Sequence, residues 1–315
     1  MNLTFETPLV LSVYIITFLI GLPSNLLAFY TFSVNIHRKP TPVDILLLNL
    51  SVSDLLLLIF LPFKMVEAVA DMKWPLPFFL CSLVVFVYFN SIYTSTLFLT
   101  AISVERYLGV AHPIQYKTNR KCKRTVMACA FIWIFSSLQC SFTYFIVQLV
   151  PSNRSDDLSC YADFTDDQLM YLLPYRLEVC LVLFCIPFII TIFCYINFIR
   201  ILITMPKVSR RKKQKAIGLV AVTLSNFILC FAPYNISHIV GFIKKGSPPW
   251  RIYTLLLSTL NASLDPLLFY YSSTAIQGRL KKCIISISKR LNLTSYSWFC
   301  GQEKQNSTEM TDASD

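Results

Sequence analysis

Two arginines and a histidine in this sequence could together bind a small anion. Arg176 lies 11 residues before Pro187, or roughly 16 Å along a helix. His238 follows Tyr234 by one helical turn, and Arg251 begins a later apolar run. Two guanidinium groups about 6 Å apart repel by roughly 3 kcal/mol at an effective dielectric constant near 20. A carboxylate between them removes that repulsion and accepts paired hydrogen bonds from both.

Acidic side chains of the chain itself could instead neutralise these arginines. Glu178 lies two residues after Arg176, and several aspartates precede it. They are Asp156, Asp157, Asp163, Asp166 and Asp167. The sequence alone leaves an anion site and an internal cluster of ion pairs equally open.

A second ionisable group, Glu105-Arg106-Tyr107, ends an apolar run of membrane length. An arginine just inside the headgroup region is costly unless it has a partner or a task. We predict that Glu105 is the partner of Arg106 while the site is idle. The alternative is an arginine that only extends its head group to the membrane surface.

Seven apolar runs must position these side chains. They cover residues 9–32, 43–66, 78–104, 125–149, 172–202, 216–243 and 252–272. Each reaches the ~20 residues that a helix needs to cross a bilayer, and the chain is only 14% charged, with a mean hydropathy of +0.57. The sequence therefore predicts an all-α membrane protein, a bundle of seven transmembrane helices.

Basic residues predict the orientation of this bundle. All but seven of the 28 lysines and arginines fall within 33–42, 106–124, 200–215 and 273–315. The seven others are Lys64, Lys73, Arg154, Arg176, Lys244, Lys245 and Arg251. Basic loops stay on the cytosolic side, so we expect a multi-pass plasma-membrane protein with an extracellular N-terminus. The net charge of +11 then reflects the topology of the protein in the membrane, and it also favours contact with acidic lipid. A nucleic-acid partner is not needed to explain it.

The segment after the last apolar run predicts a short amphipathic eighth helix at about 274–290. Its Cys283 could carry a palmitate or remain a buried thiol. We expect residues 1–290 to form one domain and residues 291–315 to be a disordered cytoplasmic tail.

Four residues on the predicted outer side are candidates for covalent modification. Asn2 and Asn153 begin N-glycosylation sequons. Cys81 and Cys160 both face the oxidising side, where a disulfide between them is feasible.

An ordered set of residues in the apolar runs resembles the rhodopsin-like (class A) G-protein-coupled receptors. The set is Asn25, Asp54, Glu105-Arg106-Tyr107, Trp133, Pro187, Pro233 and Asp265-Pro266. The resemblance implies that Arg106 meets a heterotrimeric G protein and that Cys81 pairs with Cys160. Two positions depart from the family: Phe231 replaces a tryptophan, and a tyrosine of the seventh helix is displaced to Tyr270.

Asp54 is a carboxylate near the middle of the membrane, where an ionisable residue is expected to have a function. The same resemblance implies that Ser95, Asn261 and Asp265 surround a structural sodium ion with Asp54. Sodium there would favour the idle state. Asp54 could instead be protonated and hydrogen-bonded to Asn261. We expect no other cofactor.

Five stretches resemble more narrowly the short-chain branch of the free fatty acid receptors. They are Phe63-Lys64-Met65-Val66-Glu67-Ala68, Cys160-Tyr161 followed by Phe164, Leu173-Pro174-Tyr175-Arg176-Leu177-Glu178, Pro233-Tyr234-Asn235-Ile236-Ser237-His238 and Asn261-Ala262-Ser263-Leu264-Asp265-Pro266. The resemblance implies that Arg176 and Arg251 anchor a carboxylate and that His238 and Tyr234 complete a polar cage around it.

Gln139 and Phe89 are also expected to contact the ligand, and both depart from the branch. Gln139 replaces a histidine and cannot titrate, while Phe89 stands where a relative has tyrosine and makes the site drier. Ala162 stands where a relative has glutamate. The preferred chain length of the acid is therefore open.

We predict a receptor, not an enzyme, that is activated by extracellular short-chain carboxylates such as acetate, propionate and butyrate. The resemblance implies coupling to the inhibitory class of G protein and also the Gq class, with arrestin and membrane lipid as further partners. The main alternative is a receptor for another small anion, such as a nucleotide or a hydroxy acid. A small-anion transporter is disfavoured because we find no duplicated halves and no broken helices in the sequence.

Overall fold

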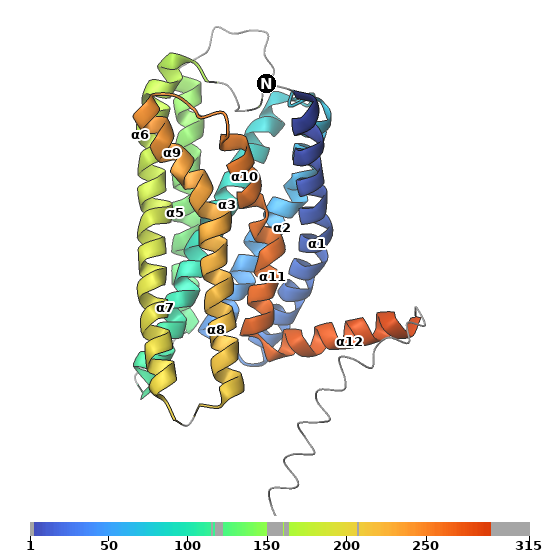
Figure 1. Cartoon of the computed structure of the whole chain (residues 1–315), viewed down its shortest axis with the longest axis vertical. Helices are drawn as coiled ribbons and strands as arrows, with labels where there is room; N and C mark the ends of the chain where they lie inside the picture. The colour runs from blue at the N-terminus through green and yellow to red at the C-terminus, as the bar shows by residue number, and fades with distance from the viewer. Residues whose placement is uncertain are drawn as a thin grey trace, which may run out of the picture. The chain divides into compact units, whose positions relative to one another are not determined.

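The computed structural model describes residues 3–290, apart from residues 115, 117–121, 150–159, 161–163 and 207. The described residues contain helices and short connections but no strand. The chain divides into two compact units, Met1–Ser272 and Ser273–Asp315. The first unit is a bundle of long, roughly aligned helices (Figure 1). The fold is therefore all-α, as predicted.

Seven segments of the described chain are long and apolar enough to cross a membrane, which confirms the predicted spans. Four of them are single helices: α1 (Leu3–Arg38), α2 (Pro42–Val69), α3 (Phe78–Ala111) and α5 (Cys122–Leu149). The other three are divided into shorter elements. The fifth span consists of α6 (Asp166–Cys180), η1 (Leu181–Cys185) and α7 (Ile186–Thr204), and the sixth of α8 (Arg210–Ser225), η2 (Asn226–Phe231) and α9 (Ala232–Lys244). The seventh consists of α10 (Arg251–Thr259) and α11 (Asn261–Ser272).

Prolines account for two of these divisions. Pro187 and Pro233 each lie at the start of an α-helix that directly follows a π-helical turn, η1 or η2. A proline donates no backbone hydrogen bond, and its ring collides with the carbonyl group four residues earlier. A turn that is one residue wider relieves this collision without ending the helix. Each of these two spans therefore continues across its proline, with a change in which side chains face inward.

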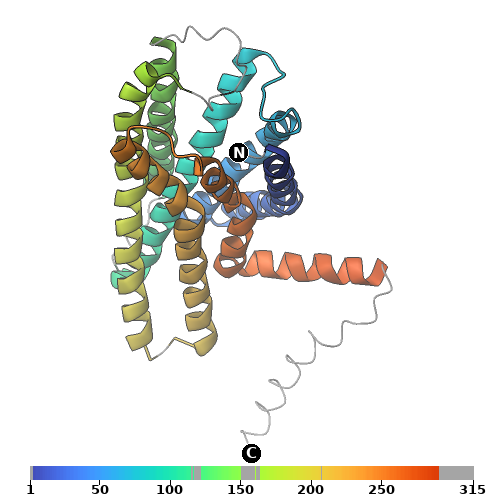
Figure 2. The same ribbon diagram turned by 45° about the horizontal axis from the view of Figure 1, so that its top comes forward.

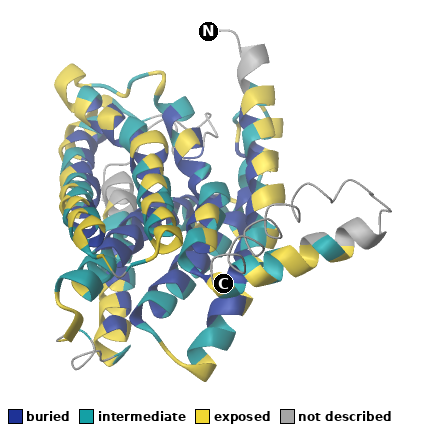
Figure 3. Ribbon diagram, turned by 60° about the horizontal axis from the view of Figure 1, so that its bottom comes forward, coloured by how far each residue is buried: buried dark blue, intermediate teal, exposed yellow. Residues whose placement is uncertain are grey.

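The bundle keeps its buried polar residues inside, among a core of apolar side chains, and exposes many apolar residues on its outer surface, which suits a membrane. Helix α3 lies among α2, α5 and α7 (Figure 2). Residues that face the interior are buried, whereas those on the outer sides of the helices are exposed (Figure 3). The exposed set includes large apolar side chains such as Leu19, Phe131 and Ile243, while Asp54 and Asp265 are fully buried. This distribution is expected where lipid replaces water around a protein.

The second unit contains α12 (Thr274–Arg290), which confirms the predicted helix after the last span. Cys283 on α12 is a free cysteine whose side chain is exposed. The tail at 291–315 lies outside the described residues.

Candidate ligand and signalling sites

A cavity of about 60 Å³ lies inside the bundle, and five of the six predicted ligand residues line it. Arg176 reaches it from α6, Tyr234 and His238 from α9, Arg251 from α10 and Phe89 from α3. These helices meet toward the end of the bundle at which α1 begins (Figure 1). Residues separated by up to 162 positions in the sequence thus converge on one small space.

Arg176 is buried, with an exposed fraction of 7%, and the partners that hold it are neutral. Its Nη1 donates to Ser247 Oγ at 2.9 Å, and its guanidinium carbon lies 4.9 Å from the centre of the Phe164 ring. A cation over an aromatic ring is attracted to the ring face. These contacts orient the guanidinium group but leave its charge uncompensated.

Arg251 is held in the same way by Tyr234. Its Nη2 donates to the Tyr234 hydroxyl group at 3.0 Å, and its guanidinium carbon lies 5.5 Å from that ring centre. The Nε atom of Arg251 is buried without a hydrogen-bond partner. The Tyr234 ring stacks on Phe89, with 5.9 Å between centroids. Phe89 thus helps to orient the Tyr234 ring, and the Tyr234 hydroxyl group in turn orients Arg251.

His238 also lines this cavity, and one of its ring nitrogens has no hydrogen-bond partner among the described residues. Its ring packs edge-on against Tyr234, with 4.5 Å between centroids. Its Nε2 lies 3.3 Å from the hydroxyl oxygen of Tyr93, which also lines the cavity. Its Nδ1 is buried without a partner. A ligand oxygen could therefore form a hydrogen bond with His238 as well as with the arginines.

Acidic side chains do not neutralise the two arginines within the described part of the chain. The ion pair found there is Lys64–Glu67, at 2.7 Å. Glu178, which could have paired with Arg176, instead accepts a hydrogen bond from Gln139 at 3.1 Å. Burying a charge is costly unless an opposite charge or hydrogen bonds compensate it. The cavity is therefore suited to an anion.

Gln139 is the sixth predicted ligand residue, and its side chain bonds to Glu178 rather than lining the described cavity. Among the lining or supporting residues that were not predicted, three contact the arginines or the histidine: Tyr93, Ser247 and Phe164, whose ring lies over Arg176. Phe164 had been noted only for its place in a family motif. Ser247 lies in a Gly-Ser-Pro-Pro stretch between helices and gave no sequence signal.

The four residues of the candidate sodium site gather in the middle of the bundle. Ser95 Oγ donates to Asp54 Oδ1 at 3.3 Å, and Asn261 Nδ2 lies 3.5 Å from the same oxygen. Three oxygen atoms in this group are buried without a donor: Asp54 Oδ2, Asp265 Oδ2 and Asn261 Oδ1. Such a surplus of acceptors fits a cation.

At the other end of the bundle, the expected ion pair between Glu105 and Arg106 is not formed. Glu105 Oε2 accepts a hydrogen bond from the hydroxyl group of Tyr116 at 2.8 Å. Arg106 Nε is buried without a partner. Adjacent residues on a helix point about 100° apart, so the side chains of Glu105 and Arg106 do not face each other. Tyr116 lies beyond the end of α3 at Ala111, and its hydroxyl group reaches Glu105 instead. Tyr107 packs its ring against Phe193 of α7.

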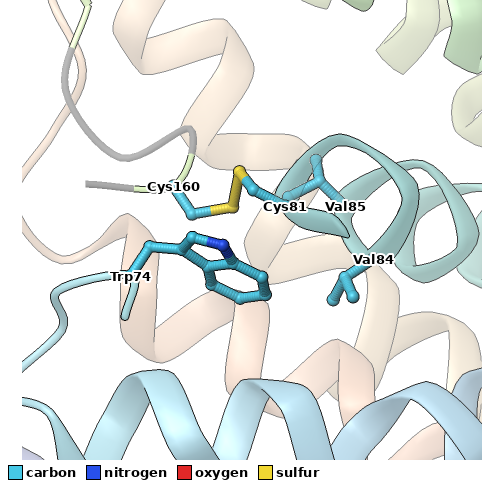
Figure 4. Packing of buried hydrophobic residues seen from close by; sticks show 5 residues of the cluster. All are labelled: Trp74, Cys81, Val84, Val85 and Cys160. Carbon is cyan, nitrogen blue, oxygen red and sulfur yellow. A yellow bond between two sulfur atoms is a disulfide. The ribbon is translucent and has the colours of Figure 1, made fainter. Parts of the chain in front are cut away.

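Cys81 and Cys160 form a disulfide, with their Cα atoms 5.8 Å apart. Both sulfurs pack beside the buried ring of Trp74, together with Val84 and Val85 (Figure 4). The bond ties the start of α3 to the segment before α6. Asn2 and Asn153, the predicted glycosylation sites, lie outside the described residues.

Comparisons with known proteins agree with this architecture. The family described as "7 transmembrane receptor (rhodopsin family)" matches residues 24–269. Free fatty acid receptor 3 of Homo sapiens is 49% identical over 271 residues, which are 85% of this chain and 78% of that receptor. Free fatty acid receptor 2 of Mus musculus is 47% identical over 288 residues, which are 90% of this chain and 87% of that receptor.

The chain therefore belongs to the rhodopsin family of seven-transmembrane receptors and, within it, to the free fatty acid receptors. It is a multi-pass membrane receptor of the G-protein-coupled class rather than an enzyme.

Proposed function

We propose that this receptor binds short-chain carboxylates from outside the cell and activates a heterotrimeric G protein inside it. The observation that carries this proposal is a pair of guanidinium groups that line one cavity, the buried Arg176 and the half-buried Arg251, without an acidic partner among the described residues. A carboxylate supplies the missing negative charge and offers acceptor positions to both arginines. The N-terminal end of the bundle is then extracellular.

The size of the cavity favours acids with few carbons. One water-sized group needs roughly 10–15 Å³ of such a cavity, so about 60 Å³ holds four to six of them. Acetate, propionate and butyrate have four, five and six non-hydrogen atoms. The cavity walls beyond the polar groups are apolar, and they include Val85, Phe86 and Val179. These residues suit a short alkyl tail.

A larger anion remains the main alternative, because a second cavity of about 330 Å³ shares Arg251 and Phe89 with the first. The other cation of this second cavity is Lys64, and Glu67 already neutralises it. A nucleotide or hydroxy acid would therefore find room there but no additional free positive charge. The small carboxylate fits the distribution of charge better.

Responses to a dose series of straight-chain carboxylates from one to eight carbons should test the ligand class. The ceiling for very small ligands is about 1.5 kcal/mol per non-hydrogen atom, so acetate gains at most roughly 6 kcal/mol. We expect half-maximal responses between tens of micromolar and millimolar concentrations. Octanoate should be much weaker than propionate. A nanomolar response to acetate, or equal potency for octanoate, would contradict the proposal.

Inside the cell, we propose that Arg106 contacts the G protein and that Glu105 and Tyr116 fix the helix end beside it. We infer coupling to the inhibitory class of G protein, with the Gq class as a second candidate and arrestin as a later partner. This inference rests on the family resemblance. Basic residues near this end, including Arg210, Arg211, Lys212 and Lys213, are exposed or half-exposed and suit an acidic partner surface and inner-leaflet lipid.

We also propose that sodium binds the group formed by Asp54, Ser95, Asn261 and Asp265. A sodium ion would satisfy the acceptor atoms that lack donors and would stabilise the closed, idle arrangement. Replacing sodium with potassium at constant ionic strength should therefore raise ligand-independent G-protein dissociation. Asp54→Asn should abolish this dependence on the cation. A cation effect that persists in Asp54→Asn would place the sodium elsewhere.

A further inference from the structure

Asn226 is a polar side chain buried in the part of the bundle that the account above does not use. It begins the π-helical turn η2, and its exposed fraction is 0%. Its Nδ2 donates to Asp265 Oδ1 at 2.6 Å, which is short for a hydrogen bond between an amide and an oxygen. A buried asparagine is costly unless it is bonded in this way. The bond joins helix α8–η2–α9 to α11.

This bond lies near the middle of the span α8–η2–α9, where it can hold the cytosolic part of the span, α8, close to α11. Asn226 directly follows α8, and Pro233 lies seven residues further along. Closer to the cytosolic end, the ring of Tyr271 on α11 lies so near Gly218 that an added Cβ would be 2.6 Å from it. This span therefore meets α11 at an apolar contact in α8 and at a polar contact at the start of η2, eight residues or roughly 12 Å apart along the helix.

The acceptor of the bond, Asp265, also belongs to the group that contains Asp54. Its second oxygen, Oδ2, has no hydrogen-bond donor. The Asn226 amide therefore donates to the one oxygen of Asp265 that has a partner. Hydrogen bonds to carboxylates are stronger than neutral ones.

We propose that Asn226 is a positioning residue that holds the span α8–η2–α9 against α11 in the idle receptor through its hydrogen bond to Asp265. The inference rests on the proposed receptor function, since it concerns the equilibrium between idle and signalling arrangements. A hydrogen bond to a charged group corresponds to roughly a ten- to hundredfold change in an equilibrium constant. Loss of the bond should shift the idle state toward signalling by an amount of that order.

Asn226→Asp tests the proposal with almost no change in size. It removes the donor and places a carboxylate opposite Asp265, so ligand-independent G-protein dissociation should rise several-fold at equal surface expression. Asn226→Leu, which is similar in volume and uncharged, should raise it too.

Asn235→Asp is the matched control, since Asn235 is also a buried asparagine of the same span and donates to the backbone oxygen of Phe231. It should not raise basal signalling. The proposal is overturned if Asn226→Asp and Asn226→Leu reach the surface with unchanged or lower basal signalling, or if Asn235→Asp raises basal signalling as much as Asn226→Asp does. All of these measurements omit ligand, so a missing response to propionate in the unmodified receptor would count against the ligand proposal only.

Discussion

Replacing either Arg176 or Arg251 with alanine should remove the response to propionate from the measurable range. Each arginine can donate charge-assisted hydrogen bonds worth roughly 1.5–3 kcal/mol, whereas a ligand of five non-hydrogen atoms gains at most about 7.5 kcal/mol in total. Loss of one arginine therefore leaves too little binding free energy. A lysine at either position should rescue poorly, because a point charge cannot reproduce the planar pair of donors.

Surface expression must be measured together with the response, since Arg176 and Arg251 also make internal contacts. Lys244→Ala is the matched control: Lys244 is an exposed cation near the same end of the bundle, and its loss should leave the potency of propionate unchanged. If both arginine variants reach the cell surface and respond to propionate with unchanged potency, the anion site lies elsewhere.

Replacing Arg106 with alanine should abolish G-protein activation while leaving ligand binding intact. Arg106 lies in the last third of α3, and the ligand cavity is lined by residues near the start of that helix, such as Ser82 and Phe89. The two sites are 17 residues apart along α3 between Phe89 and Arg106, or roughly 26 Å. Saturation-transfer NMR of propionate on purified receptor measures binding, and G-protein dissociation measures activation.

Arg38→Ala provides a matched control, because Arg38 is an exposed arginine at the end of α1, on the same side of the bundle as Arg106. We expect it to bind propionate and to activate the G protein as the unmodified receptor does. Retention of full G-protein activation by Arg106→Ala would contradict the role assigned to this arginine.

The sequence predicts the framework of the site well because its signals are local. Apolar length identifies the seven spans, and Arg176, Tyr234, His238, Arg251 and Phe89 all line one cavity as expected. These residues converge because each lies within a few turns of the same end of its helix. Their role in binding stays a prediction until ligands are measured.

The pairings between side chains were harder to predict, because they depend on how each helix is rotated. The π-helical turns η1 and η2 each add a residue to a turn, which shifts the inward face by about 100° relative to a regular helix. Counting at 3.6 residues per turn therefore could not reveal that Asn226, at the start of η2, meets Asp265. Tyr116 bonds to Glu105 only because the chain turns back after α3.

Propionate and propionamide compared on the unmodified receptor test the central claim most directly, because the ligand is changed and the protein is not. The two molecules have nearly the same shape, but propionamide carries no charge and offers one acceptor oxygen where propionate offers two. We expect propionate to saturate the receptor at submillimolar to millimolar concentrations, and propionamide to give neither binding nor G-protein dissociation at the same concentrations. Equal responses to the two would show that Arg176 and Arg251 do not recognise a carboxylate.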